Sequence, residues 1–196
     1  MQYVVLTQGE TQESSYQSFV QEVVRGARDG GADVELLTLD GILGCDKCND
    51  EWGACKAEQI CSNREDNFQD IQRTVRDADA LCVIAPVQDG DLAEPVMNFL
   101  DRTRRCESGA SGTLVGKPIL VLAFPEGANN GQLACLEHMD RFCRQTGAVI
   151  FDFFSINSWN SDYTKQSSYS AGRVMAFGRK AGDPTKGTFR RRTRLK

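Results

Sequence analysis

The 196-residue sequence lacks the features that mark several large classes of proteins. No apolar run approaches the ~20 residues that cross a bilayer, so we expect no membrane span. The N-terminus has neither the basic flank nor the long apolar stretch of a secretory signal, which predicts a cytoplasmic protein with mostly reduced thiols. There is no GxGxxG and no GxxxxGK[ST] motif, so neither a dinucleotide fingerprint nor a P-loop is indicated.

Histidine is almost absent as well. The single one, His138, is expected on a helix face away from the loops that could bind a ligand. With one histidine, a Ser-His-Asp or Cys-His mechanism is not expected. The side chains alone therefore favour chemistry that is carried by a cofactor.

The composition is that of one globular domain, with 40% hydrophobic and 26% charged residues. The charge is uneven, because residues 179–196 hold eight basic side chains and one acidic one. We interpret residues 1–180 as one domain and residues 181–196 as a basic tail. The tail has no aromatic-rich platform beside it, so docking on an acidic protein face is favoured and nucleic-acid binding is not expected.

Short apolar runs alternate with helical patterns along the whole chain. The apolar spacing predicts strands at 3–6, 34–39, 80–85, 119–124 and 149–154, and helices near 16–27, 68–75, 92–100, 133–143 and 166–180. Strands without polar alternation are typical of a parallel sheet that is buried on both faces. Right-handed crossovers then favour an α/β, doubly wound, three-layer sandwich.

Ligands of such sheets bind outside the carboxyl ends of the strands. Three loops are therefore candidates, which we call loop one (residues 7–15), loop two (86–92) and loop three (124–131). The candidate ligand-binding residues in them are Thr7, Gly9, Thr11, Ser14, Ser15, Pro86, Val87, Gln88, Asp89, Gly90, Asp91, Phe124, Pro125 and Gly127.

Loops one and two also have a purely structural interpretation. Loop one offers hydroxyls and a helix N-terminus to a phosphate, but Glu10 and Glu13 would repel an anion unless they point outward. An ordinary strand-to-helix turn is the alternative. Loop two could lie along a flat ring system, and its Asp91 could equally cap the helix that follows.

Eight cysteines are many for a reduced protein, and four of them lie between residues 45 and 61. Four thiolates at this C-x2-C-x6-C-x5-C spacing could hold a zinc ion or an iron–sulfur cluster. Reduced thiols packed in a loop, or a redox-active pair, remain the alternatives. The four candidate ligands are Cys45, Cys48, Cys55 and Cys61. The other four include three expected core residues, Cys82, Cys135 and Cys143, and Cys106, which has no predicted role.

Two runs of sequence carry a family resemblance. GCDKCNDEWGACKAEQICSNREDNFQDI and ADALCVIAPVQDGDLAEPVMNFLDRTRR resemble the NAD(P)H-dependent FMN reductases and the related iron–sulfur flavoproteins of the flavodoxin-like superfamily. The matching features are the four clustered cysteines, Asp66, Phe68, Ala78-Asp79, Pro86-Val87, Gly90 and Phe99-Leu100-Asp101-Arg102.

The resemblance implies a flavodoxin-like fold with a five-stranded parallel sheet of order 2-1-3-4-5. It implies FMN, with the phosphate at loop one and the ring against loops two and three. It also implies hydride transfer from NADH or NADPH to a small-molecule or protein acceptor, in a homodimer or homotetramer.

Two other functions stay open at this stage. One is an iron–sulfur flavoprotein that carries electrons through a cluster on residues 45–61. The other is a flavodoxin-like binding module without a cofactor, suggested by the glutamates of loop one and by Gln88, where the family usually has a tyrosine.

Overall fold

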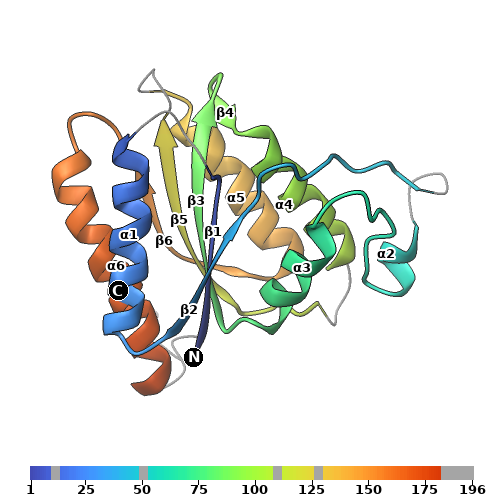
Figure 1. Cartoon of the computed structure of the whole chain (residues 1–196), viewed down its shortest axis with the longest axis horizontal. Helices are drawn as coiled ribbons and strands as arrows, with labels where there is room; N and C mark the ends of the chain where they lie inside the picture. The colour runs from blue at the N-terminus through green and yellow to red at the C-terminus, as the bar shows by residue number, and fades with distance from the viewer. Residues whose placement is uncertain (10–13, 49–52, 108–111, 126–129, 182–196) are drawn as a thin grey trace, which may run out of the picture.

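The computed structural model of the chain describes residues 1–9, 14–48, 53–107, 112–125 and 130–181 (Figure 1). Its strands are β1 (Gln2–Thr7), β2 (Asp33–Thr38), β3 (Ala80–Gln88), β4 (Asp91–Leu92), β5 (Pro118–Pro125) and β6 (Val149–Ser155). Its helices are α1 (Ser14–Asp29), α2 (Ala54–Ala57), α3 (Phe68–Asp77), α4 (Glu94–Cys106), α5 (Gln132–Thr146) and α6 (Ser161–Ala181).

Five strands run parallel in the order β2-β1-β3-β5-β6. Helices α1 and α6 lie on one face of the sheet, and α3, α4 and α5 lie on the other (Figure 1). The three-layer flavodoxin-like fold is confirmed. The predicted strand order 2-1-3-4-5 is also confirmed, because the fourth and fifth predicted strands correspond to β5 and β6. The expectation of an entirely parallel five-stranded sheet was wrong in one respect, because β4 adds a short antiparallel strand to the end of β3.

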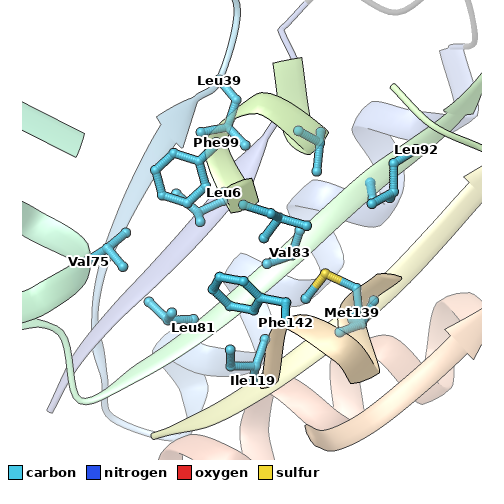
Figure 2. Close-up of a cluster of buried hydrophobic side chains, with 14 of the residues drawn as sticks. Leu6, Leu39, Val75, Leu81, Val83, Leu92, Phe99, Ile119, Met139 and Phe142 are labelled. Carbon is cyan, nitrogen blue, oxygen red and sulfur yellow. The ribbon is translucent and has the colours of Figure 1, made fainter. Parts of the chain in front are cut away.

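Alternate residues of the central strands pack into two cores, because successive side chains of a strand point to opposite faces. Val4, Leu6 and Val83 join the core under α3, α4 and α5, where Phe99, Met139 and Phe142 surround them (Figure 2). Tyr3, Val5 and Ile84 face the other way, toward α1 and α6. Burial on both faces explains why the strands read as continuous apolar runs.

Several elements differ in extent from the sequence-based expectation. Strand β3 continues through Pro86, because the proline carbonyl accepts a hydrogen bond from the Ala93 amide (3.0 Å) and Pro86 pairs with Phe124. Helix α6 begins at Ser161 rather than near 166, and the Asn160 carbonyl accepts from the Thr164 amide (3.0 Å) at its start. Helix α2 was not expected. None of the described helices is both long and apolar enough to cross a membrane.

Helices α1 and α6 pack with almost no space between their backbones. A Cβ atom added at Gly26 would lie 2.1 Å from the carbonyl oxygen of Tyr169, and one at Gly30 would lie 2.6 Å from that of Arg173. Tyr169 also donates a hydrogen bond to Asp29 (2.9 Å). The glycines of α1 therefore allow the last helix to close one face of the sheet. The basic tail beyond it, residues 182–196, lies outside the described residues, so its role stays a prediction.

Candidate functional site

Loops two and three meet at the carboxyl edge of the sheet. A Cβ atom added at Gly131 would lie 2.6 Å from the Cα, carbonyl carbon and carbonyl oxygen of Gly90. Gly131 also has φ +88°, a left-handed conformation that glycine adopts without the steric cost of a side chain. Two of the three candidate loops are thus in backbone contact.

Loop two is a tight hairpin rather than an open loop. Val87 pairs with Leu92 and Gln88 with Asp91, while Asp89 (φ 50°) and Gly90 (φ 86°) form the turn. Positive φ at both central residues is the pattern of a type I′ turn, which suits the twist of a two-residue hairpin. The hairpin fixes the backbone of this candidate ring-binding segment.

The capping role expected for Asp91 was wrong. The residue at the N-cap of α4 is Ala93, and Pro95 lies in the first turn as expected. Asp91 belongs to β4, and its carboxylate accepts a hydrogen bond from the amide of Leu92 (2.8 Å). His138 Nδ1 lies 3.7 Å from Asp91 Oδ1, so the expectation that this histidine lies away from the loops was also wrong.

Loop three begins later than expected, because Phe124 and Pro125 are strand residues. The ring of Phe124 is buried in an edge-to-face arrangement with Tyr16 (centroids 5.3 Å apart) and Phe19 (5.7 Å). Its side chain therefore packs in the core, and only its backbone remains as a candidate ligand contact. Gly127 lies outside the described residues.

The described part of loop one is held by the hydroxyl of Tyr16. That oxygen lies 2.6 Å from Thr7 Oγ1, accepts from the Gln8 amide (3.1 Å) and donates to the Ile84 carbonyl (2.8 Å). Burial raises the pKa of Tyr16 to about 12, so the hydroxyl keeps its proton at neutral pH. Tyr16 thereby ties the end of β1 to β3. Ser15 is half-buried in the first turn of α1, and Thr11 lies outside the described residues.

We expect the Tyr16→Phe variant to lose about 1–3 kcal/mol of unfolding free energy, because the Gln8 amide and the Ile84 carbonyl each lose a partner. Urea unfolding followed by circular dichroism measures the loss. Tyr163→Phe is the matched control, since Tyr163 is 64% exposed on α6 and its variant should unfold like the wild type. Equal stability of the two variants would contradict the role given to the Tyr16 hydroxyl.

A carboxylate of the chain itself lies against loop one. The Gly9 amide donates to both oxygens of Asp40 (3.0 and 2.9 Å), and Thr38 Oγ1 donates to Asp40 Oδ2 (2.6 Å). Asp40 follows β2, the strand beside β1, and is exposed to solvent. One backbone donor that a phosphate would use is therefore already bonded to an anion.

A buried acceptor without a partner belongs to Gln8, the residue before Gly9. Gln8 Oε1 is inaccessible to solvent and has no hydrogen-bond partner within the described residues. Such an atom costs free energy unless a bound group donates to it. The hydroxyls of a ribityl chain are donors of this kind, so the unpartnered oxygen of Gln8 is compatible with a bound flavin side chain.

The four clustered cysteines line one small cavity together with Cys106 and Arg102. Cys61 is buried, and the other three are half-buried. Ser62 Oγ donates to Cys48 Sγ (3.2 Å), and Arg102 Nη2 lies 3.4 Å from Cys61 Sγ. The cavity measures about 20 Å³, roughly the space of one water molecule.

Metal binding by these thiols stays a prediction. Among the residues whose positions are described, no group of three or more metal-binding side chains has the geometry of a site. As they are arranged, the described residues therefore form neither the predicted cluster site nor a zinc site.

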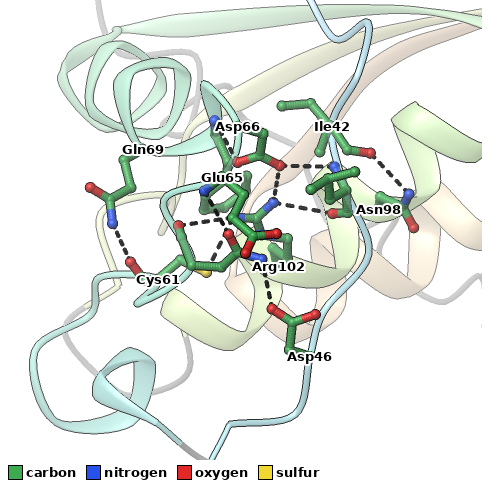
Figure 3. Close-up of polar contacts among 11 residues, drawn as sticks. Ile42, Asp46, Cys61, Glu65, Asp66, Gln69, Asn98 and Arg102 are labelled. Carbon is green, nitrogen blue, oxygen red and sulfur yellow. Dashed lines mark hydrogen bonds and ion pairs between the residues drawn. The ribbon is translucent and has the colours of Figure 1, made fainter.

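A buried ion pair joins α4 to the chain just after the clustered cysteines, which we call the cysteine segment (residues 61–66). Arg102 pairs with Asp66, donates to the Leu43 carbonyl (3.1 Å) and lies over the ring of Phe68 (4.1 Å to the centroid), as Figure 3 shows in part. Asp66 also accepts from the amides of Leu43 (2.8 Å) and Phe68 (3.2 Å). Asp66, Phe68 and Arg102 are features of the family resemblance, and the structure brings all three together.

The remaining cysteines match the sequence-based expectation of core residues. Cys82, Cys135 and Cys143 are buried, and burial raises the pKa of each thiol, to about 12 for Cys135 and Cys143. Cys106 had no predicted role, yet it lines the cysteine cavity. The signal that could have placed it there is its position one helical turn after Arg102 on α4.

Two residues of the site were missed, Asp40 and Gln8. No ligand loop is predicted from the sequence after the second strand, although β2 ends at the same sheet edge as β1. The position of Asp40 just after this strand is therefore a signal that could have placed it at the ligand edge. The unpaired oxygen of Gln8 was not, because only the tertiary packing buries it.

The strand order and the three layers define a flavodoxin-like fold. A sequence profile described as NADPH-dependent FMN reductase matches residues 1–161. The chain belongs to the NADPH-dependent FMN reductase family. No curated protein sequence matches it significantly.

Solved structures share the fold at low sequence identity. A flavodoxin from the domain Archaea has a TM-score of 0.59 and 12% identity, covering 92% of this chain and 99% of that one. The NAD(P)H:quinone oxidoreductase from Methanothermobacter marburgensis has 0.60 and 14%, covering 89% and 96%. The flavodiiron protein from Giardia intestinalis has 0.59 and 15%, covering 91% of this chain and 37% of that one, so the chain spans little more than a third of it.

Proposed function

We propose that the protein is an FMN-dependent NAD(P)H oxidoreductase of the flavin or quinone reductase type. The observation that carries the proposal is the ligand edge itself, where the backbones of Gly90 and Gly131 touch and the Gln8 side-chain oxygen is buried without a partner. Family membership supports the choice of FMN and of a nicotinamide as the reductant. The second acceptor would be a small molecule or a protein.

Backbone groups supply most of the contacts in this proposal. The hairpin turn at Asp89 and Gly90 would present its backbone to the ring, and Gln8 Oε1 would accept a hydrogen bond from the ribityl chain. Bound FMN supplies a ring that accepts a hydride from the nicotinamide and passes the electrons on. The side chains orient the ligand and exclude water, consistent with a chain that has a single histidine.

The test is a titration of FMN with purified, reduced protein, followed by NADH or NADPH oxidation in the presence of a quinone or free flavin. We expect quenching of the flavin fluorescence and loss of nicotinamide absorbance that needs both protein and acceptor. Protein that binds FMN but oxidises neither nicotinamide would contradict the oxidoreductase and leave an electron carrier. Protein that binds no flavin would favour the binding module without a cofactor.

The same material tests the remaining family-based proposals. Iron and sulfide analysis of anaerobically purified protein decides the cluster, for which the described thiols form no site as they are arranged. Light scattering decides the proposed homodimer or homotetramer.

A further inference from the structure

The Asp40 carboxylate lies at the backbone amide of Gly9, a donor that an anionic ligand of this sheet edge would use. Its two oxygens share the single N–H of Gly9 in a bifurcated hydrogen bond, at 3.0 and 2.9 Å, and so occupy a backbone donor of the kind that binds a phosphate oxygen. Thr38 orients the carboxylate through its hydroxyl (2.6 Å), and the Asp40 amide donates back to Thr38 Oγ1 (3.1 Å). The chain itself thus places an anion on loop one.

The contact leaves no room for a second group at the same donor. A Cβ atom added at Gly9 would lie 2.1 Å from Asp40 Oδ2. The neighbouring amide, that of Gln8, is bonded to the Tyr16 hydroxyl. Residues 7–15 also contain no lysine or arginine that could offset the charge of Asp40.

We propose that Asp40 sets the preference of the site between phosphorylated and unphosphorylated flavins by competing with the 5′-phosphate for the Gly9 amide. The inference rests on the proposed flavin-binding function and goes beyond it by naming the residue that controls phosphate recognition. Because Asp40 is exposed, a phosphate can displace it, but the two anions then lie close together. Wild-type protein therefore gains little affinity from the phosphate.

The test uses Asp40→Asn, which removes the charge and keeps an oxygen that can accept from Gly9. Repulsion between a dianion and a neighbouring carboxylate in water corresponds to about tenfold in affinity. We expect the variant to bind FMN about tenfold more tightly than the wild type does, and to bind riboflavin as the wild type does. Fluorescence titrations with riboflavin and FMN give both dissociation constants.

Asp79→Asn is the matched control. Asp79 also accepts a hydrogen bond from a backbone amide, that of Gln2 (2.9 Å), but at the opposite end of β1, about 17 Å away along the strand. The control changes the net charge by the same amount, so it should leave both affinities unchanged. An equal gain in FMN affinity for the two variants would show a general charge effect and overturn the inference.

The other outcomes are also decisive. A wild-type protein that binds FMN a hundredfold more tightly than riboflavin, or an Asp40→Asn variant with unchanged FMN affinity, contradicts the role of Asp40 while leaving the proposed function intact. Gain of FMN binding by the variant alone would support the inference. Failure of both proteins to bind either flavin would contradict the proposed function together with the inference.

Discussion

Replacement of Arg102 by methionine is expected to lower the unfolding free energy by about 3–5 kcal/mol, the cost of leaving a buried charge without its partner. The Arg102 side chain is fully buried and that of Asp66 is 4% exposed. The variant would also lose the hydrogen bond to the Leu43 carbonyl and the contact with Cys61. Chemical denaturation measures the change.

Arg104→Met is the control on the same helix. Arg104 pairs with Asp101 at 3.2 Å, but both side chains are accessible to solvent, so its replacement should cost less than about 1 kcal/mol. If the two variants lost similar stability, the ion pair of Arg102 would not be what holds the cysteine segment to α4.

The same pair gives the stability a defined dependence on pH. Burial alone would raise the pKa of Asp66, but the Arg102 guanidinium and the amides of Leu43 and Phe68 together hold it below its usual value. A lowered carboxyl pKa contributes stability that is present above the unfolded-state value, about 4, and is lost as the pH falls through the folded-state value. Stability of the wild type should therefore fall more steeply below about pH 4 than that of Asp66→Asn.

Gly131→Ala is expected to have the largest effect on ligand binding. The added methyl group would lie 2.6 Å from the backbone of Gly90, at a residue with φ +88°. The two loops would have to move apart, and with them the backbone that the proposed function places against the flavin ring. We expect FMN affinity to fall by more than about tenfold, measured by fluorescence titration.

Gly116→Ala separates the clash from the backbone strain. Gly116 has a similar positive φ of +70°, but nothing lies within 4 Å of its added Cβ, and it precedes β5 at the other end of the sheet. Both variants are destabilised by placing a side chain at positive φ. Only Gly131→Ala should lose flavin affinity, and a similar loss in both would contradict the contact between loops two and three as the cause.

The sequence by itself determined the five parallel strands, the five longer helices, their order and the sheet edge where the candidate ligand loops lie. Apolar runs such as 119–124 had to be strands buried on both faces, and parallel strands place their following loops at one edge. Local spacing also placed Pro95 in the first turn of a helix. These features follow from neighbouring residues and from the handedness of the chain.

The tertiary structure alone decided how the site is arranged. The contact of His138 with Asp91, the Asp40 carboxylate on Gly9 and the joint cavity of Cys61 and Cys106 each join residues that are distant along the chain. No local pattern encodes such contacts, because they depend on where separate strands and helices end once the sheet is packed. The fold was therefore readable from the sequence, while the balance of charge and donors at the ligand edge was not.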